Sequence, residues 1–381
     1  MNKKIKIIAD DKIPFLKGVF EPFANVEYYP GNEITREKIL DADALIIRTR
    51  TKCNADLLEG TNIKFIATAT IGIDHIDTEY CNRNNIKWVN APGCNSSSVM
   101  QYVTSALLTI AEKEKFNLKD KTIGIIGVGN VGSKVQSMAE IIGMNVLLND
   151  PPRARKEGDD KFVDLETIIN ESDIITFHVP LIKEGEDKTY HLGSEDFFRK
   201  LKKKPVIINS SRGSVIETSA IKNAIKNDDV KNVIIDVWEN EPNIDLELLH
   251  LVDFGTPHIA GYSADGKANG TAVSVNELNK FFQMNLHPNW YPENVPMPIE
   301  GNEINIDCNN LSEQKVLFGA VTKTYNITYD NKILRMSPET FEIQRGNYRI
   351  RREFDSFNLK LSSCSASIEN KLLQLGFKID H

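Results

Sequence analysis

The chain has 381 residues, of which 41% are apolar and 26% are charged, and its formal net charge is -7. This length predicts two or three domains, because a single hydrophobic core rarely grows beyond about 300 residues. The acidic balance argues against a nucleic-acid-binding protein, which usually carries a basic excess. Apolar runs such as 103–111 are too short to cross a bilayer. We therefore expect a globular protein that binds neither nucleic acid nor membrane.

The cysteines are odd in number, widely spaced and form no C-x-x-C pair: Cys53, Cys81, Cys94, Cys308 and Cys364. This pattern predicts neither a disulfide framework nor a zinc site, so we expect no bound metal. Free thiols are typical of a reducing compartment. We therefore expect a cytoplasmic protein.

Short β-branched runs alternate with helical patterns over the first two thirds of the chain, which predicts parallel sheets built from crossover units. In the first 95 residues, strands are expected over 6–9, 44–47, 65–68 and 87–90. A helix from about Ser97 to Lys115 follows, and a serine cluster can cap it. A second sheet is expected to begin at Lys121, with strands over 123–126, 145–148, 174–178, 206–209 and 232–237.

A further helix is expected over 264–284 and should pack back on the first sheet. A proline-rich linker follows and leads to a C-terminal segment of about residues 300–381, called the tail. The tail contains a strand-like run over 316–321 and a helical run over 367–375. The predicted fold class is α/β, with two doubly wound parallel-sheet domains and a smaller α+β C-terminal domain. The expected domains are 1–95 with 260–286, 96–259, and 287–381.

A glycine-rich motif, Gly127-Val-Gly-Asn-Val-Gly132, lies between a predicted strand and a predicted helix. Gly127 allows a tight turn, Gly129 lets the backbone approach a pyrophosphate, and Gly132 lets the helix pack close to the strand. Asn130 and Val131 begin the helix, whose free N–H groups can bind phosphate. The alternative is a glycine-rich turn without a ligand.

Asp150 ends the next predicted strand, 23 residues after Gly127. An acidic side chain at this position binds the ribose hydroxyls and repels a 2′-phosphate, which favours NAD over NADP. Arg153 follows closely and could instead neutralise a 2′-phosphate. We expect NAD as the cofactor.

Arg212, Glu241 and His258 each follow a predicted strand of the second sheet. Ligands of open α/β sheets bind outside the carboxyl ends of the strands, so these loops should share one site. Each residue taken alone is more often structural. Their order after successive strands favours a catalytic set.

The combination of G-x-G-x-x-G, N-S-x-R-G, D-V-x-x-x-E-P and P-H-I-A-G resembles the D-isomer-specific 2-hydroxyacid dehydrogenases. The resemblance implies a flavodoxin-like substrate domain, a Rossmann NAD domain and a catalytic role for Arg212, Glu241 and His258. Oxidation of a 2-hydroxy acid removes a hydride from C2 and a proton from its hydroxyl. His258 would take the proton, Glu241 would orient the imidazole, and Arg212 would pair bidentately with the carboxylate.

Further segments resemble the members of this family that oxidise 4-phospho-D-erythronate to 2-oxo-3-hydroxy-4-phosphobutanoate in pyridoxal 5′-phosphate biosynthesis. The segments are 68–75, 91–95, 149–153, 176–181, 258–262 and, in the tail, 348–354. The resemblance implies a homodimer formed through the C-terminal domain. It implies cofactor contacts at Val179, Ser210, Ser211, Arg212, Asp236 and Gly261, and substrate contacts at Thr49, Thr70 and Tyr262.

A phosphorylated substrate needs cations at its far end, and Arg48, Arg50 and Lys52 follow a predicted strand of the first domain. We hypothesise that at least one of them, with Arg48 the first candidate, contacts the phosphate. The alternative is a solvated charged loop. Two other functions stay open: a 3-phosphoglycerate dehydrogenase with the same catalytic trio, and an NAD(H)-sensing corepressor-like binding protein.

Overall fold

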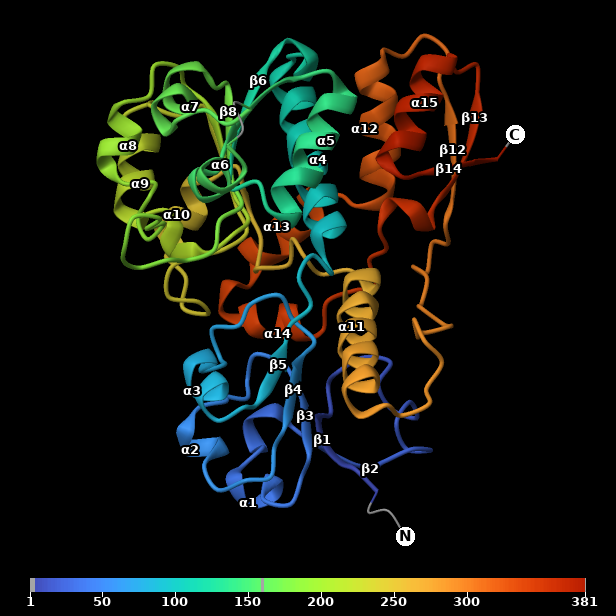
Figure 1. The fold of residues 1–381 in the computed structure, drawn as a ribbon. Coiled ribbons are helices and arrows are strands. Elements are labelled where there is room, and N and C mark those ends of the chain that lie inside the picture. The colour runs from blue at the N-terminus through green and yellow to red at the C-terminus, as the bar shows by residue number, and fades with distance from the viewer. Residues whose placement is uncertain (1–3, 159–160, 381) are drawn as a thin grey trace. The chain divides into compact units, whose positions relative to one another are not determined.

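The computed structural model describes residues 4–158 and 161–380. The chain divides into two compact units. Unit 1 consists of Met1–Asn95 and Ser263–Pro296, and unit 2 consists of Ser96–Tyr262 and Met297–His381. Each unit contains a parallel sheet with helices on its faces (Figure 1).

Unit 1 is built on a parallel sheet in the order β2-β1-β3-β4-β5, which is the flavodoxin-like order. Its strands are β1 (Lys6–Asp10), β2 (Asn25–Tyr29), β3 (Ala44–Ile47), β4 (Phe65–Thr68) and β5 (Lys87–Val89). Its helices are α1 (Arg36–Ile39), α2 (Ala55–Leu58), α3 (Thr78–Arg83) and α11 (Ala264–Phe282). β3 and β4 are buried along their whole length, since helices and loops cover both faces of the sheet. Val275 and Leu278 of α11 join the core on one of these faces.

Unit 2 contains a parallel sheet in the order β11-β10-β9-β8-β6-β7. Its strands are β6 (Thr122–Ile126), β7 (Asn145–Asn149), β8 (Ile174–Phe177), β9 (Val206–Asn209), β10 (Asn232–Ile235) and β11 (Phe254–Gly255). An isolated parallel bridge from Leu148 to Phe162 extends the sheet beyond β7. With this bridge the order is that of a dinucleotide-binding fold, and the strand order reverses between β6 and β8. Ligands of such sheets bind at this reversal, directly after β6.

The helices around this sheet are α4 (Ser96–Glu114), α5 (Asn130–Ile142), α6 (Pro151–Glu157), α7 (Leu165–Glu171), α8 (Glu195–Arg199), α9 (Thr218–Lys226) and α10 (Leu246–Leu251). Short 3-10 helices occur in both units at Gly31–Glu33, Leu118–Asp120, Gly213–Val215, Pro338–Thr340 and Phe354–Ser356.

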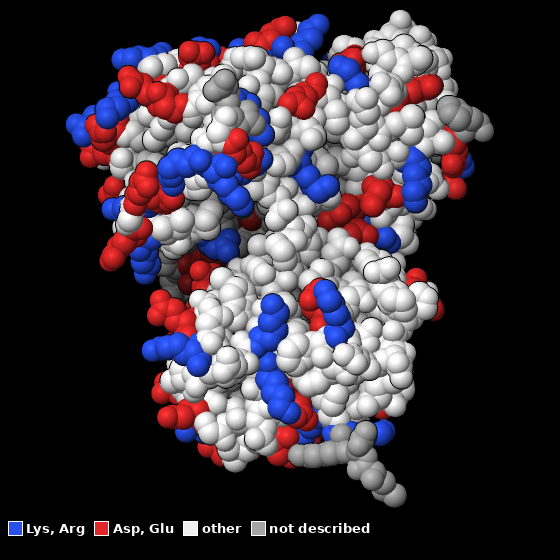
Figure 2. Space-filling model, viewed as in Figure 1, with Lys and Arg blue, Asp and Glu red and all other residues white. Residues whose placement is uncertain are grey.

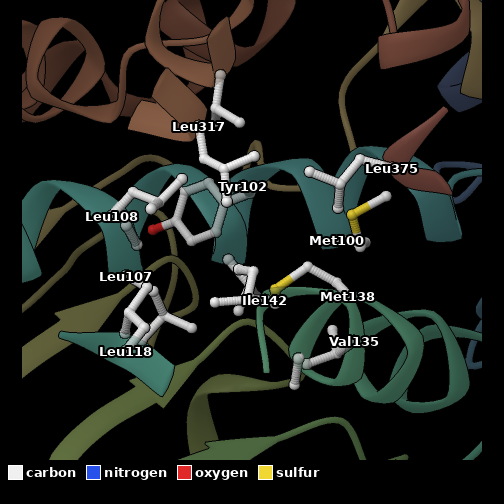
Figure 3. Packing of buried hydrophobic residues seen from close by; sticks show 14 of the residues in the cluster. Met100, Tyr102, Leu107, Leu108, Leu118, Val135, Met138, Ile142, Leu317 and Leu375 are labelled. Atoms are coloured by element: carbon white, nitrogen blue, oxygen red, sulfur yellow. The ribbon is translucent and has the colours of Figure 1, made fainter. Parts of the chain in front are cut away.

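The C-terminal part of unit 2 has a small parallel sheet, in the order β12-β13-β14. Its elements are β12 (Glu303–Asp307), α12 (Glu313–Thr324), α13 (Ile327–Met336), α14 (Phe341–Gly346), β13 (Asn358–Ser362), α15 (Ala366–Leu375) and β14 (Lys378–Asp380). Leu317 of α12 and Leu375 of α15 share one apolar core with Tyr102 of α4 and Met138 of α5 (Figure 3). The tail therefore packs as a continuation of unit 2, and its assignment to a domain of its own stays a prediction.

Two expectations about the tail are wrong. The run 316–321, expected as a strand, lies in α12, where Val316, Leu317, Ala320 and Val321 are buried with helical spacing. A short apolar run does not by itself separate a strand from a buried helix. A disulfide also joins Cys308 and Cys364. β12 and β13 run parallel in register from Glu303↔Asn358 to Asp307↔Ser362, which brings these two cysteines together just after the strand ends.

Acidic and basic side chains are interspersed on the visible face of both units (Figure 2). Among the described residues, no helix combines the length and the apolar character that crossing a membrane requires. Within the same residues, no cluster of His, Cys, Asp and Glu side chains has the arrangement of a metal site.

Candidate active site and nucleotide-binding loop

The glycine-rich loop joins β6 to α5 at the reversal of the strand order. Gly127 has φ +88°, and a Cβ on it would lie 2.7 Å from the carbonyl oxygen of His178 and from Cγ1 of Val179. A Cβ on Gly132 would lie 2.0 Å from the carbonyl oxygen of Gly127. Gly129 instead has no atom of the residues that the structure describes within 4 Å of such a Cβ. The first and third glycines are thus required by the fold, and the second keeps the backbone open to an approaching ligand.

α5 begins at Asn130, with Val131 in its first turn, so unpaired N–H groups of a helix N-terminus border the space beside Gly129. Such an N-terminus is suited to the pyrophosphate of a dinucleotide. Two further polar atoms, Nδ1 of His178 and Oγ of Ser210, are buried with no hydrogen-bond partner among the described residues. His178 directly follows β8, which pairs with β6, and Ser210 directly follows β9, which pairs with β8. These features fit a bound dinucleotide.

Asp150 follows β7 and is hydrogen-bonded to the backbone of the glycine loop. Its Oδ2 accepts a hydrogen bond from the amide of Val128 at 2.8 Å, and its Oδ1 caps α6 by accepting one from the amide of Arg153 at 3.1 Å. Arg153 Nε lies 2.6 Å from Glu157 Oε1, so an acidic side chain already balances its charge. Asp150 therefore presents a carboxylate at the ribose position, and this arrangement favours NAD over NADP.

Asp236 follows β10 and fixes the loop that carries His258. It is 1% exposed; its Oδ1 accepts hydrogen bonds from Thr256 Oγ1 at 2.6 Å and from the Ile259 amide at 2.8 Å. Its Oδ2 accepts one from the Ala260 amide at 2.9 Å, and its carbonyl oxygen accepts one from the His258 amide at 2.8 Å. Burial raises the pKa of Asp236 in spite of these donors. The predicted cofactor-contacting residue is thus also the anchor of the histidine loop.

His258 and Glu241 form a hydrogen-bonded pair. His258 Nδ1 lies 2.7 Å from Glu241 Oε2, and Glu241 Oε1 accepts a hydrogen bond from the Trp238 amide at 2.8 Å. Burial raises the pKa of Glu241, but the hydrogen bond and charge of His258, the Trp238 amide and the charge of Arg345 outweigh it, so the net shift is downward. An ionised Glu241 keeps the ring proton on Nδ1, which leaves Nε2 as the basic nitrogen of the neutral imidazole.

Arg212 follows β9 in a loop that Asn209 organises. Asn209 Oδ1 accepts hydrogen bonds from the amide and the hydroxyl of Ser211, and Asn209 Nδ2 donates to the carbonyl oxygen of Arg212 at 3.0 Å. A Cβ on Gly213 would lie 1.9 Å from the carbonyl oxygen of Trp238. The glycine therefore lets the arginine loop pack against the loop that leads to Glu241.

The remaining predicted positions of unit 2 lie in the same loops. Val179 borders Gly127. Gly261 and Tyr262 follow the two amides held by Asp236, and the Tyr262 amide donates to the carbonyl oxygen of Ile259 at 2.8 Å.

The predicted substrate contacts of unit 1 lie after β3 and β4. Arg48 Nε is 3.3 Å from Oδ2 of Asp10, which is 1% exposed. Thr49 is exposed in the turn that follows. Thr70 Oγ1 lies 2.7 Å from the hydroxyl of Thr68, which also lies 3.0 Å from Nε2 of His75. Arg50 and Lys52 line a hollow with Arg36 and Asn54, and Arg48 is not part of this lining.

Sequence reasoning missed two groups of site residues. Asp10, at the end of β1, orients Arg48, and its position at a strand end was the available signal. Arg345 and Arg351 come from the tail and contact the loop after His258. No sequence motif predicts the contacts of Arg345 and Arg351, because each contact joins residues more than 80 positions apart.

Comparison with known proteins extends this description. Residues 101–260 match the family model described as D-isomer specific 2-hydroxyacid dehydrogenase, NAD binding domain, and residues 300–376 match a domain of unknown function (DUF3410). An erythronate-4-phosphate dehydrogenase of Bacteroides thetaiotaomicron is 53% identical over 93% of this chain and 99% of its own length. Those of Porphyromonas gingivalis and Escherichia coli are 41% and 39% identical, over 93% and 99% of this chain and 95% and 99% of their own lengths.

Solved structures show the same fold. The NAD+-bound 3-phosphoglycerate dehydrogenase of Entamoeba histolytica is 27% identical with a TM-score of 0.62, over 74% of this chain and 96% of its own. The D-lactate dehydrogenase of Aquifex aeolicus, complexed with NAD and lactic acid, has a TM-score of 0.60 at 24% identity, over 73% of this chain and 95% of its own.

Fold, glycine loop and sequence matches together define an NAD-dependent dehydrogenase of the D-isomer-specific 2-hydroxyacid class. This confirms the predicted fold class, the enzyme class and the cofactor. Within that class the chain belongs to the erythronate-4-phosphate dehydrogenase family.

Proposed function

We propose that this chain oxidises 4-phospho-D-erythronate with NAD to 2-oxo-3-hydroxy-4-phosphobutanoate, a step of pyridoxal 5′-phosphate biosynthesis. The observation that carries the proposal is the Glu241–His258 hydrogen bond of 2.7 Å, set in loops that follow β10 and β11 of a dinucleotide-binding sheet. Erythronate-4-phosphate dehydrogenases are 53% and 41% identical to this chain over 93% of its length, which supports this choice of substrate.

The geometry of the Glu241–His258 pair supports the proposed catalytic roles. His258 Nε2 takes the proton of the C2 hydroxyl, and the ionised carboxylate of Glu241 stabilises the imidazolium that results. Arg212 forms a bidentate pair with the substrate carboxylate and polarises the C2 oxygen. Bound NAD supplies the acceptor for the hydride that leaves C2. Charge and atoms balance, because the alcohol loses one hydride and one proton.

The cofactor would be held by the residues that surround β6. Its pyrophosphate would lie against Gly129 and the first turn of α5, and its adenosine ribose against Asp150. The proposed contacts farther along the sheet are Val179, Ser210, Ser211, Asp236 and Gly261. The buried, unpartnered hydroxyl of Ser210 supports this set.

Substrate specificity would come from Thr49, Thr70, Tyr262 and Arg48. Arg48 is favoured over its neighbours for the phosphate, because the buried carboxylate of Asp10 holds its guanidinium in place. Lys267 provides a second cation near Arg48, because desolvation and the charge of Arg48 both lower the pKa of its ammonium group. Two adjoining cations that repel one another are stabilised when a dianion binds.

The substrate is tested by following the oxo-acid product from NAD with 4-phosphoerythronate and, in parallel, with 3-phosphoglycerate. The product is measured together with NADH, because tightly held NADH can hide turnover. We expect a clear preference for 4-phosphoerythronate. Preference for 3-phosphoglycerate would keep the mechanism and overturn the substrate. Tight NADH binding without turnover on either acid would favour an NAD(H)-sensing role.

We also propose a homodimer formed through the tail. Tyr329 and Met336 are 52% and 72% exposed and lie seven positions apart on α13, so they share one helix face; Ile343 of α14 is 61% exposed. Light scattering should give about twice the monomer mass of 42.9 kDa. Tyr329→Asp with Met336→Asp should give monomers, whereas Leu246→Asp, at an exposed position of α10, should not. A monomeric wild type would contradict the proposal.

Finally, we propose that the protein works in the cytoplasm, where its cofactor NAD is available. The free thiols of Cys53, Cys81 and Cys94 support this location, whereas the Cys308–Cys364 disulfide does not. Cell fractionation should place it with cytoplasmic markers, and recovery with an oxidising compartment would contradict the proposal.

A further inference from the structure

The tail contacts the histidine loop of unit 2 at two neighbouring points. Arg351 is 2% exposed; its guanidinium donates to the carbonyl oxygens of Ile259 and Ala260 at 3.3 and 3.0 Å. The same guanidinium donates to the carbonyl oxygen of Ser98, and its Nε donates to Oε1 of Gln101 at 2.8 Å. The two residues that follow His258 are therefore bound to the tail through their carbonyls, while Asp236 binds their amides.

The second contact involves a side chain already proposed to touch the substrate. Arg345 of α14 donates from Nη2 to the hydroxyl of Tyr262 at 3.2 Å, and its guanidinium carbon lies 5.7 Å from the centre of the tyrosine ring. The Tyr348 ring meets the same tyrosine edge-on at 6.0 Å. Tyr262 is thus oriented by two residues of the tail.

Arg345 also carries charge into the neighbourhood of the catalytic pair. Its side chain is 23% exposed, and its Nη1 lies 2.7 Å from Oε1 of Glu342, a more exposed side chain. Its Nε is buried and has no hydrogen-bond partner within the described part of the chain. Its charge contributes to the lowered pKa of Glu241. A permanent cation therefore lies beside Tyr262, and its charge acts on Glu241 from a mostly buried side chain.

We propose that Arg345 is a substrate-positioning residue: it holds the Tyr262 hydroxyl and supplies a fixed positive charge beside the Glu241–His258 pair for an anionic substrate. The tail, of which residues 300–376 match a domain of unknown function, is then part of the active site. The compared dehydrogenase structures align with only 73–74% of this chain. The inference rests on the proposed function, because it requires Tyr262 to contact the substrate.

The test compares Arg345→Gln, Arg345→Lys and Tyr262→Phe with the wild type in the full-length protein. For Arg345→Gln we expect the KM for 4-phosphoerythronate to rise about ten- to a hundredfold, as for the loss of one charge-assisted hydrogen bond. Arg345→Lys keeps the positive charge, so its KM should rise less than that of Arg345→Gln. The affinity for NADH, followed by its fluorescence, and the thermal midpoint should stay within error. Lys332→Gln, an exposed charge loss on α13, is the matched control and should leave KM unchanged.

A double-mutant cycle separates positioning from general destabilisation. If Arg345 acts through Tyr262, the effects of Arg345→Gln and Tyr262→Phe on KM should be clearly less than additive. An unchanged KM in Arg345→Gln, or an equal loss of NADH affinity, would overturn the proposal. If the wild type prefers 3-phosphoglycerate, the substrate assignment fails, and the same comparison on that acid still decides the role of Arg345. If it oxidises neither acid, both proposals fail.

Discussion

Arg212 is the residue whose chemistry is hardest to replace by a similar side chain. A guanidinium offers two parallel N–H donors to a carboxylate, and an ammonium group does not. We expect Arg212→Lys to lower kcat/KM about ten- to a hundredfold with NADH affinity retained, in line with the loss of a bidentate charged pair. Steady-state kinetics measure this, with exposed Arg199→Lys as the control. Wild-type kinetics in Arg212→Lys would remove Arg212 from the site.

His178 should make the stability of the folded protein depend on pH. Burial lowers its pKa to about 3, so the folded protein keeps this ring neutral while the unfolded chain, with a pKa near 6.5, protonates it. The unfolded state then binds more protons, and stability falls as the pH falls below about 6.5. From about pH 7.5 to about pH 5 the loss should be roughly 2 kcal/mol.

Urea unfolding of the full-length protein at about pH 7.5 and about pH 5 measures this loss in the free energy of unfolding. His178→Gln should show a pH-dependent loss smaller by that amount, while His250→Gln, at an exposed position of α10, should behave like the wild type. The same pH dependence in His178→Gln and wild type would contradict the assignment.

Residues of the predicted site differ in how far the sequence could foretell them. Arg212, Glu241 and His258 could be found because each follows a strand in a motif of fixed order. The structure pairs Glu241 with His258 by a hydrogen bond, and the catalytic roles of all three residues stay proposals. Arg345 and Arg351 could not be found, because only the packed fold brings them to the loop after His258. A contact made by one long side chain leaves no periodicity or spacing to read.

At the scale of elements, the glycine loop gives a sharp prediction. Gly127→Ala combines a left-handed backbone, at about 1–2 kcal/mol, with a clash against the His178 carbonyl. Gly185 has nearly the same φ, +87°, and among residues 4–158 and 161–380 no atom lies within 4 Å of its Cβ position, so Gly185→Ala should bear the backbone cost alone. We expect NADH affinity to fall in Gly127→Ala and to be unchanged in Gly185→Ala. Equal NADH affinity in both would contradict the role of this loop.

Strands were predictable where both faces are buried. β3, β4, β8 and β9 are mostly apolar and buried at every residue, and the structure has each of them within a residue of its expected bounds. β2 was missed because it is an edge strand, Asn-Val-Glu-Tyr-Tyr, in which no residue is fully buried. The run 316–321 was mistaken for a strand because its helical period is visible only once its packing against α4 is known.

At the scale of the molecule, the tail shares one hydrophobic core with the rest of unit 2. Leu317 and Leu375 pack in the same apolar cluster as Tyr102 and Met138 (Figure 3). The Cys308–Cys364 disulfide lies wholly within the tail. Its pairing depends on the register of two parallel strands, which the spacing of the cysteines does not reveal.

The most direct test of the account is the oxidation of 4-phosphoerythronate by the wild type and by His258→Gln, with oxo-acid formation as the readout. A positioned base supplies about 10²- to 10⁴-fold in rate, so kcat should fall by that factor. NADH affinity should be retained, because His258 is not among the proposed cofactor contacts. A fall of that size with intact NADH binding is the predicted result. Turnover by His258→Gln at the wild-type rate would contradict the mechanism proposed for this enzyme.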